Sequence, residues 1–152
     1  MTHVGKITAV IKTGNINDAP TDGRVYLGIG GREFRLNKPG DQFKKGATDT
    51  FIIGDGGNID NPRHANELPF FQGTENCPRL EFSDLPKFPA YIRLEDDEED
   101  DKDWNVEAVT VVAVKYDFGA PSIPAEARTY NSGLAGHIWL GGKFGKMLQL
   151  LS

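Results

Sequence analysis

Cysteine is almost absent from this chain, with a single residue among 152. An intrachain disulfide needs two cysteines and a thiolate metal cluster needs more, so neither can hold the fold together. A chain of this length can bury about two thirds of its unfolded surface without such a crosslink. The sequence therefore predicts one domain, residues 1–152, built around a hydrophobic core. The low cysteine count also favours a reducing compartment, without excluding secretion.

Long apolar runs are also missing. No segment approaches the roughly 18 consecutive apolar residues that span a bilayer. The first residues, MTHVGKITAVIKTG, lack the basic stretch and following apolar stretch of a signal peptide. We therefore expect a soluble chain without a transmembrane segment, cytoplasmic by default.

Basic residues are in deficit, with 17 Lys and Arg against 22 Asp and Glu and a formal net charge of -5. Affinity for nucleic acid comes mainly from phosphate neutralisation by Lys and Arg, so nucleic acid is an improbable partner on charge grounds. Much of the acidic excess lies in residues 95–103, EDDEEDDKD. A cation is the more natural partner for this charge pattern.

Helical periodicity is weak, whereas alternating apolar residues are frequent. The composition of 18 Gly and 9 Pro with only 2 Met favours short strands joined by turns. In Lys6–Lys12 the alternation places Ile7, Ala9 and Ile11 on one face, as a half-buried strand requires. Comparable patterns predict a hairpin at residues 24–36, with Phe34 and Leu36 inward, and strands at residues 49–53, 79–82, 91–94, 104–116, 137–140 and 146–151.

Several short strands separated by turns indicate two antiparallel sheets packed face to face. The fold class is therefore predicted to be all-β, a sandwich of about eight strands. The segment 104–116 is nearly continuous in Val, which predicts a strand that is buried on both sides or bulged. Residues 54–89 are rich in Gly, Pro and Asn and are interpreted as a long insertion between the middle strands. Residues 117–152 are interpreted as a divergent C-terminal extension.

Four sequence blocks occur in the order that is typical of one family. They are a Thr-Gly strand end at Thr13, the polar loop and strand of residues 14–27, the motif D-x-F-x-x-G-x-x-D-x-F at residues 41–51, and the motif W-x-V-x-x-V-x-V beginning at Trp104 after an acidic loop. In these blocks the chain resembles the PLAT (LH2) domain family, named after polycystin-1, lipoxygenase and alpha-toxin. The resemblance covers about half of the chain and implies an eight-stranded β-sandwich that serves as a binding or targeting scaffold.

The resemblance also implies a possible calcium site. In calcium-binding members the first loop and the acidic loop lie at the same end of the sandwich, and Ca²⁺ is held by carboxylate, amide and backbone oxygens. Carried over position by position, the predicted ligands are Gly14 through its carbonyl, Thr21, Asp22, Asp96, Asp97 and Glu98. The chain departs from the family at Pro20, where Gly is usual. A solvated acidic loop without a ligand and an Asx turn at Asp22 remain alternatives.

A membrane-facing module also needs exposed apolar side chains and some basic residues. Phe70 and Phe71 are the best candidates for apolar contacts, although anchoring of the insertion to the sandwich is the favoured interpretation of this pair. Lys44 and Lys45 form the only basic pair and are the predicted partners of a lipid headgroup or of an acidic surface.

Catalytic arrangements are poorly represented. The three histidines, His3, His64 and His137, are far apart in sequence, and no serine lies in a nucleophile-elbow motif. The Gly-rich stretch 28–31 precedes a strand-like segment, whereas a phosphate-binding loop precedes a helix. We therefore predict a non-catalytic binding module that docks on a protein partner, possibly with calcium. The alternative is a calcium-dependent module that targets a lipid or membrane surface.

Overall fold

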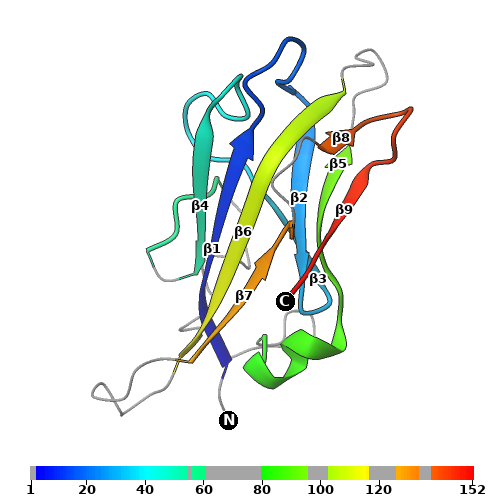
Figure 1. Ribbon diagram of the computed structural model, residues 1–152. Helices are drawn as coiled ribbons and strands as arrows, with labels where there is room; N and C mark the ends of the chain where they lie inside the picture. The colour runs from blue at the N-terminus through cyan, green and yellow to red at the C-terminus, as the bar shows by residue number, and fades with distance from the viewer. Residues whose placement is uncertain (1–2, 55, 61–79, 96–102, 117–125, 134–137) are drawn as a thin grey trace.

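The structure is a β-sandwich of two antiparallel sheets (Figure 1). It is a computed structural model that describes residues 3–54, 56–60, 80–95, 103–116, 126–133 and 138–152. These residues contain nine strands and one 3-10 helix: β1 (His3–Thr13), β2 (Arg24–Ile29), β3 (Arg32–Arg35), β4 (Thr48–Gly54), η1 (Phe82–Lys87), β5 (Ala90–Glu95), β6 (Trp104–Tyr116), β7 (Ala127–Asn131), β8 (Ile138–Leu140) and β9 (Met147–Leu150). The predicted all-β sandwich is confirmed, with nine strands in place of about eight.

The two sheets have different strand orders. The first sheet has the strand order β4-β1-β6-β7, and β8 pairs with residues 104–106 of β6, before the part that pairs with β7. The second sheet has the order β3-β2-β5-β9. Backbone hydrogen bonds between Asn131, at the end of β7, and Leu151, just after β9, join the two sheets along one side. In the described part of the chain, no helix is long and apolar enough to cross a bilayer.

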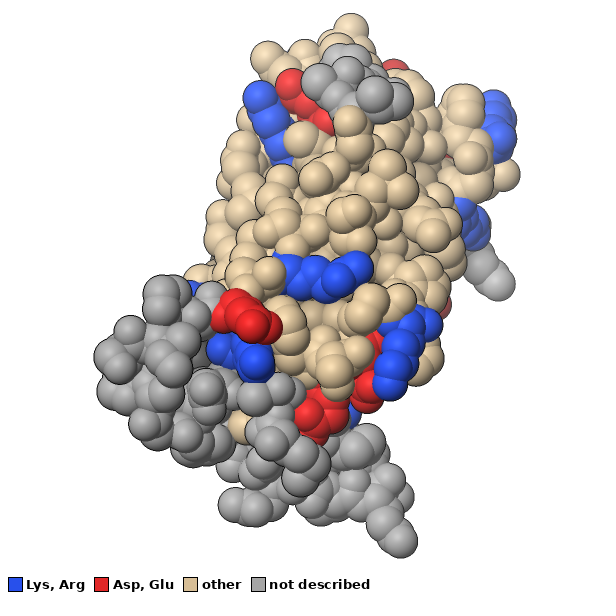
Figure 2. Space-filling view, turned by 60° about the horizontal axis from the view of Figure 1, so that its bottom comes forward, with Lys and Arg blue, Asp and Glu red and all other residues tan. Residues whose placement is uncertain are grey.

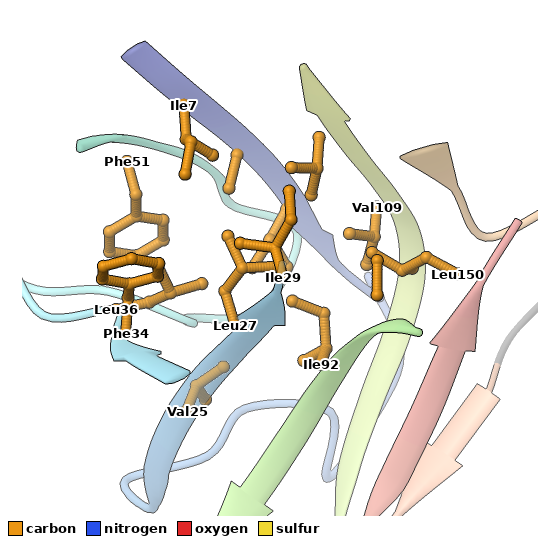
Figure 3. Packing of buried hydrophobic residues seen from close by; sticks show 14 of the residues in the cluster. Ile7, Val25, Leu27, Ile29, Phe34, Leu36, Phe51, Ile92, Val109 and Leu150 are labelled. Atoms are coloured by element: carbon orange, nitrogen blue, oxygen red, sulfur yellow. The ribbon is translucent and has the colours of Figure 1, made fainter. Parts of the chain in front are cut away.

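The core lies between the sheets and follows the alternation that the sequence shows. Ile7 of β1 lies in the core with Leu27 of β2 and Ile92 of β5 (Figure 3), and these three side chains and Ile11 are fully buried. On β1 and β5 their neighbours along the strand are only partly buried, as a period of two residues requires, whereas on β2 the Tyr91 ring covers Gly28. The predicted inward positions on β1 and on the β2–β3 hairpin are therefore confirmed.

The longest strand pair, β1 with β6, is bulged as the Val-rich sequence predicted. Its register shifts between Val4 and Lys6 and again between Lys12 and Thr13. Along the middle of β6 burial alternates, with Val111 and Ala113 inward and Val112 partly exposed. The bulges thus allow one long strand to follow the twist of the sheet while its inward positions stay on one face.

Two local predictions differ from the structure. The strand predicted at residues 79–82 is wrong, because Glu81 forms only an isolated bridge with His3 and Phe82 begins η1. Leu85 is the fully buried residue of this short helix, and Pro86 and the extended Phe88 end it. Strand β7 was not predicted, because only one of its five side chains, Tyr130, is buried.

The outer face of the second sheet carries a network of charged and aromatic side chains. Arg93 donates to both oxygens of Glu33, from Nε at 2.9 Å and from a terminal nitrogen at 2.8 Å, and its guanidinium lies 4.4 Å from the ring centre of Tyr26. The Tyr91 hydroxyl donates to Glu33 at 2.7 Å. A Cβ at Gly28 would lie 2.1 Å from the Tyr91 ring, so only glycine allows this ring to lie across β2.

Replacing Glu33 by Gln should make stability less dependent on pH. Hydrogen bonds from Arg93 hold the pKa of the Glu33 carboxyl below its usual value. A group whose pKa is lowered in the folded state contributes stability above its unfolded pKa, and this contribution is lost as the pH falls through the folded pKa. We expect Glu33→Gln to lower the urea midpoint at pH 7 and to have little effect near pH 3. An equal loss at both pH values would contradict this role.

Candidate functional site

The loops at one end of the sandwich form the candidate binding surface. The loop between β1 and β2 (residues 14–23), the segment before β4 (residues 37–47), the start of β6 and the turn between β8 and β9 (residues 141–146) lie at the upper end in Figure 1. The N-terminal end of β1 and η1 lie at the lower end. Segments that are far apart in sequence are therefore brought together at one end.

Backbone hydrogen bonds fix the first of these loops, residues 14–23, between its neighbours. On one side the Gly46 N–H donates to the Gly14 carbonyl at 3.0 Å. On the other side Asn105 accepts from the Gly14 N–H and donates to the Ala19 carbonyl, both at 3.0 Å. Ala19 is fully buried, so the middle of the loop is anchored in the core. The exposed residues beside it are thereby held in defined positions.

The motif at residues 41–51 builds the support beneath the loops. Phe43 is buried with φ of 56°, and its ring lies between Phe51, at 5.4 Å, and Trp104, at 5.1 Å, measured between ring centres. The buried carboxylate of Asp49 accepts the Phe43 N–H at 2.9 Å. The Trp104 indole N–H donates to the Thr13 hydroxyl at 3.1 Å. Trp104 is thus a core residue, and the Asp49 carboxylate holds the turn at Phe43 that precedes it in the chain.

An open pocket of about 720 Å³ lies among these loops. Its lining residues come from the four segments that meet at this end: Asn17, Asp18, Pro20, Asp22, Lys44, Lys45, Asp103, Trp139 and Phe144. Small-molecule sites typically enclose about 300–1,000 Å³. The pocket combines three carboxylates, two ammonium groups and two aromatic rings, so it offers contacts for charged and for apolar parts of a ligand.

Trp139 of β8 and Phe144 of the β8–β9 turn form an aromatic pair. Their ring centres are 6.2 Å apart and the ring planes are inclined by 30°. Phe144 is 58% exposed, which makes it one of the most exposed large apolar side chains of the described chain. The turn is closed by the Gly141 N–H, which donates to the Gly145 carbonyl at 2.8 Å. The sequence analysis missed this pair, although a Phe within the turn GGKFG is a recognisable signal for an exposed apolar tip.

The predicted first-loop ligands have different environments. The Thr21 side chain is buried and its hydroxyl accepts the Gly23 N–H at 3.0 Å. The Gly14 carbonyl already accepts the Gly46 N–H. Asp22 is 65% exposed and its carboxylate lies 3.4 Å from Lys44 Nζ. Of these three, Asp22 is the residue whose oxygens are most accessible to a cation.

The predicted lysine pair lies at the same pocket as Asp22. Lys45 Nζ is 3.5 Å from Asn17 Oδ1, and both lysines are exposed. The predicted contacts Phe70 and Phe71 lie outside the described residues, as do the predicted ligands Asp96, Asp97 and Glu98. The residues on either side of that acidic segment are described.

These flanking residues lie beside the first loop. Glu95 is paired with Arg24 at the start of β2, and their side chains are 3.9 Å apart. Asp103 lines the pocket, and its carboxylate packs against Gly141, where a Cβ would lie 1.9 Å from Asp103 Oδ1. Among the described residues, no group of three or more His, Cys, Asp and Glu could hold a metal ion. Asp22 is therefore the accessible carboxylate among the predicted calcium ligands that the structure describes.

Comparison with solved structures identifies the class of fold. The chain is similar to part of the alpha toxin of Clostridium absonum, with 21% identity and a TM-score of 0.55 over 98% of this chain and 32% of the toxin. It is also similar to part of the Clostridium perfringens alpha-toxin from avian strain SWCP, with 22% identity and a TM-score of 0.50 over 85% of this chain and 31% of the toxin. A lipoxygenase in complex with arachidonate gives 15% identity and a TM-score of 0.54 over 99% of this chain and 16% of the lipoxygenase.

These similarities are consistent with the PLAT (LH2) fold, since alpha-toxin and lipoxygenase are two of the proteins that give this family its name. At 15 to 22% identity they concern the fold alone. The chain spans about a third of the toxins and about a sixth of the lipoxygenase. No protein-family model and no curated protein sequence matches the chain.

Proposed function

We propose that this domain is a non-catalytic module that binds a membrane surface through the loops around the 720 Å³ pocket. The observation that carries the proposal is the aromatic pair of the exposed Phe144 and the half-buried Trp139, at the same pocket as Lys44 and Lys45. Aromatic side chains partition into the interfacial region of a bilayer, and lysines there meet the phosphates of lipid headgroups. The two requirements for peripheral membrane binding thus occur side by side.

Rigid support favours this use of the loops. The lysine turn follows Phe43, whose backbone is held by Asp49, and the first loop is hydrogen-bonded on both sides. Side chains that are already ordered lose less conformational entropy on binding. Ordered loops would favour binding of either a membrane or a protein, and the aromatic rings beside the lysines are the reason why we place the membrane function ahead of the protein docking that the sequence analysis placed first.

The Trp139→Ala/Phe144→Ala double variant should bind mixed phosphatidylcholine and phosphatidylglycerol vesicles at least tenfold more weakly than the unaltered protein. The removal of two rings forfeits apolar surface that would enter the interface, worth about 1.5–3 kcal/mol for each fully buried side chain. Co-sedimentation with vesicles measures the loss. Phe88→Ala is the matched control, because Phe88 is 45% exposed and follows η1 at the other end of the sandwich. Failure of the unaltered protein to sediment, with or without calcium, would rule out the membrane function.

Calcium is the proposed regulator of this binding. Asp22 would supply carboxylate oxygens, and Asp96, Asp97 and Glu98 would supply the rest, since Ca²⁺ takes about 6–8 oxygens. A bound cation would also relieve repulsion among the carboxylates and offset the acidic charge that opposes an anionic membrane.

Millimolar calcium is expected to raise the melting temperature of the purified protein, and a chelator to reverse the rise. A ligand that binds only the native state stabilises it by RT ln(1 + [L]/Kd), which is about 2.7 kcal/mol at 100 times Kd. Asp22→Ala should abolish most of the shift measured by calorimetry, whereas Asp41→Ala, an exposed carboxylate outside the pocket, should retain it. An unchanged melting temperature in millimolar calcium would exclude the ion but not calcium-independent membrane binding.

Protein docking is the second candidate function, and the outer face of the β4-β1-β6-β7 sheet favours it. Figure 2 shows a mostly uncharged surface between the ends of the molecule, interrupted by a Lys or Arg side chain near its centre. Outward positions on these strands include Val10, Ile52 and Val112, all partly exposed. Uncharged surfaces of this kind are typical of protein interfaces. Absence of vesicle binding by the unaltered protein would leave this candidate in first place.

A further inference from the structure

We propose that the pocket recognises a zwitterionic headgroup that joins an N-methylated ammonium to a phosphate, of the phosphocholine type. This inference rests on the proposed membrane function, because it names the headgroup that the pocket selects. It follows from how the two signs of charge and the aromatic rings are distributed over the pocket lining.

The lining carries both signs of charge in nearly equal number. Asp18, Asp22 and Asp103 bring three carboxylates, and Lys44 and Lys45 bring two ammonium groups. A ligand with only negative charge would meet the repulsion of the carboxylates, and one with only positive charge would meet that of the lysines. A zwitterion satisfies both sets of groups at once.

The aromatic pair determines which kind of cation fits. Trp139 and Phe144 present adjacent rings that are inclined by 30° at the side of the pocket. Aromatic faces attract cations, and quaternary ammonium groups are recognised in this way because their methyl groups also bury apolar surface. Carboxylates beside the rings add attraction for a cation that can make no hydrogen bond through its nitrogen. The rings together with Asp103, whose carboxylate packs against Gly141 of the same turn, are therefore suited to the ammonium end.

The lysines suit the phosphate end. Lys44 Nζ lies 3.4 Å from Asp22 and Lys45 Nζ lies 3.5 Å from Asn17, both longer than a typical charged hydrogen bond of about 2.7–2.9 Å. The side chains of Lys44 and Asp22 are 50% and 65% exposed, so this pair is weak and a phosphate can replace the partner. The pocket volume of about 720 Å³ leaves room for the whole headgroup with water around it.

Titration with soluble headgroups tests the inference independently of membranes. Phosphocholine should bind and change the fluorescence of Trp139, whereas inorganic phosphate alone should not, and phosphoethanolamine should bind at least about tenfold more weakly because it lacks the methyl groups. Trp104 is buried and contributes a constant background. Phe144→Ala and Asp103→Asn should each weaken phosphocholine binding about tenfold by calorimetry, whereas Phe88→Ala and Asp84→Asn, at the other end of the molecule, should leave it unchanged.

Vesicles of single lipids separate this inference from the proposed function. Binding to phosphatidylcholine and weak binding to phosphatidylglycerol support both. Equal binding to both lipids without any response to soluble phosphocholine would overturn the headgroup inference while leaving the membrane function in place. Phosphocholine binding without vesicle binding would sustain the inference and overturn the membrane function. A response to a neutral sugar such as maltose in place of phosphocholine would make the pocket a glycan site and overturn the inference.

Discussion

Trp104→Ala is expected to lower the free energy of unfolding by about 3–5 kcal/mol, the largest effect of any substitution considered for this chain. Trp104 is fully buried at the start of β6, directly beneath the candidate site. Its ring packs edge-on against Phe43, and its indole N–H donates to the Thr13 hydroxyl. Truncation would leave a cavity under the loops and deprive the buried hydroxyl of a donor.

Chemical denaturation followed by circular dichroism measures this loss. Trp104→Phe keeps a ring in the site and removes the indole N–H, so its cost should be about 1–3 kcal/mol. Trp139→Ala is the matched control, because Trp139 lies partly exposed on the pocket and should change stability by less than about 1 kcal/mol. A loss below about 1 kcal/mol for Trp104→Ala would contradict the packing described for this end of the core.

Asp49→Ala is expected to cost about 2–3 kcal/mol and to weaken vesicle binding as well. Asp49 is 5% exposed, and its carboxylate accepts the backbone N–H of Phe43, a residue with positive φ. A buried donor left without its partner costs about 1–3 kcal/mol, and more when the partner is charged. Because Lys44 and Lys45 follow Phe43 directly, relaxation of this turn would also displace the lysines from the pocket.

The Asp49→Asn variant separates the two contributions. An amide oxygen can still accept the Phe43 N–H, so the turn and vesicle binding should be largely retained at a smaller cost in stability. Asp41→Ala removes an exposed carboxylate from the same segment and should have almost no effect on either measurement. Loss of vesicle binding in Asp41→Ala as large as in Asp49→Ala would show that charge, and not the turn, is responsible.

The residues that define the motif at residues 41–51 form one supporting turn in the structure, which the sequence alone did not reveal. Phe43 and Phe51 stack, Gly46 with φ of 70° turns its N–H toward Gly14, and Asp49 closes the turn. The sequence analysis placed Asp49 at the start of the strand predicted at residues 49–53, and it does lie near the start of β4. Asp49 acts as a buried acceptor because the chain turns between Phe43 and Asp49, so that the Phe43 N–H meets the Asp49 carboxylate.

Of the candidate site, the sequence predicted parts but not their arrangement. Asp22 and the pair Lys44–Lys45 were named for separate reasons, and the structure places all three at one pocket. The predicted roles of Asp96, Asp97, Glu98, Phe70 and Phe71 stay predictions. Trp139 and Phe144 were missed, because an aromatic residue in a turn can pack inward or outward, and only its neighbours in space decide which.

The alternation of apolar residues by itself determined the fold class, most of the strands and the inward face of β1 and β2, because side-chain direction in a strand follows from local geometry alone. Tertiary structure decided what lies at the loop end. Three carboxylates, two lysines and two aromatic rings from four separate segments share a pocket there because antiparallel pairing brings the ends of β1, β4, β6 and β8 together in one sheet. Such proximity depends on long-range contacts, which no local pattern encodes.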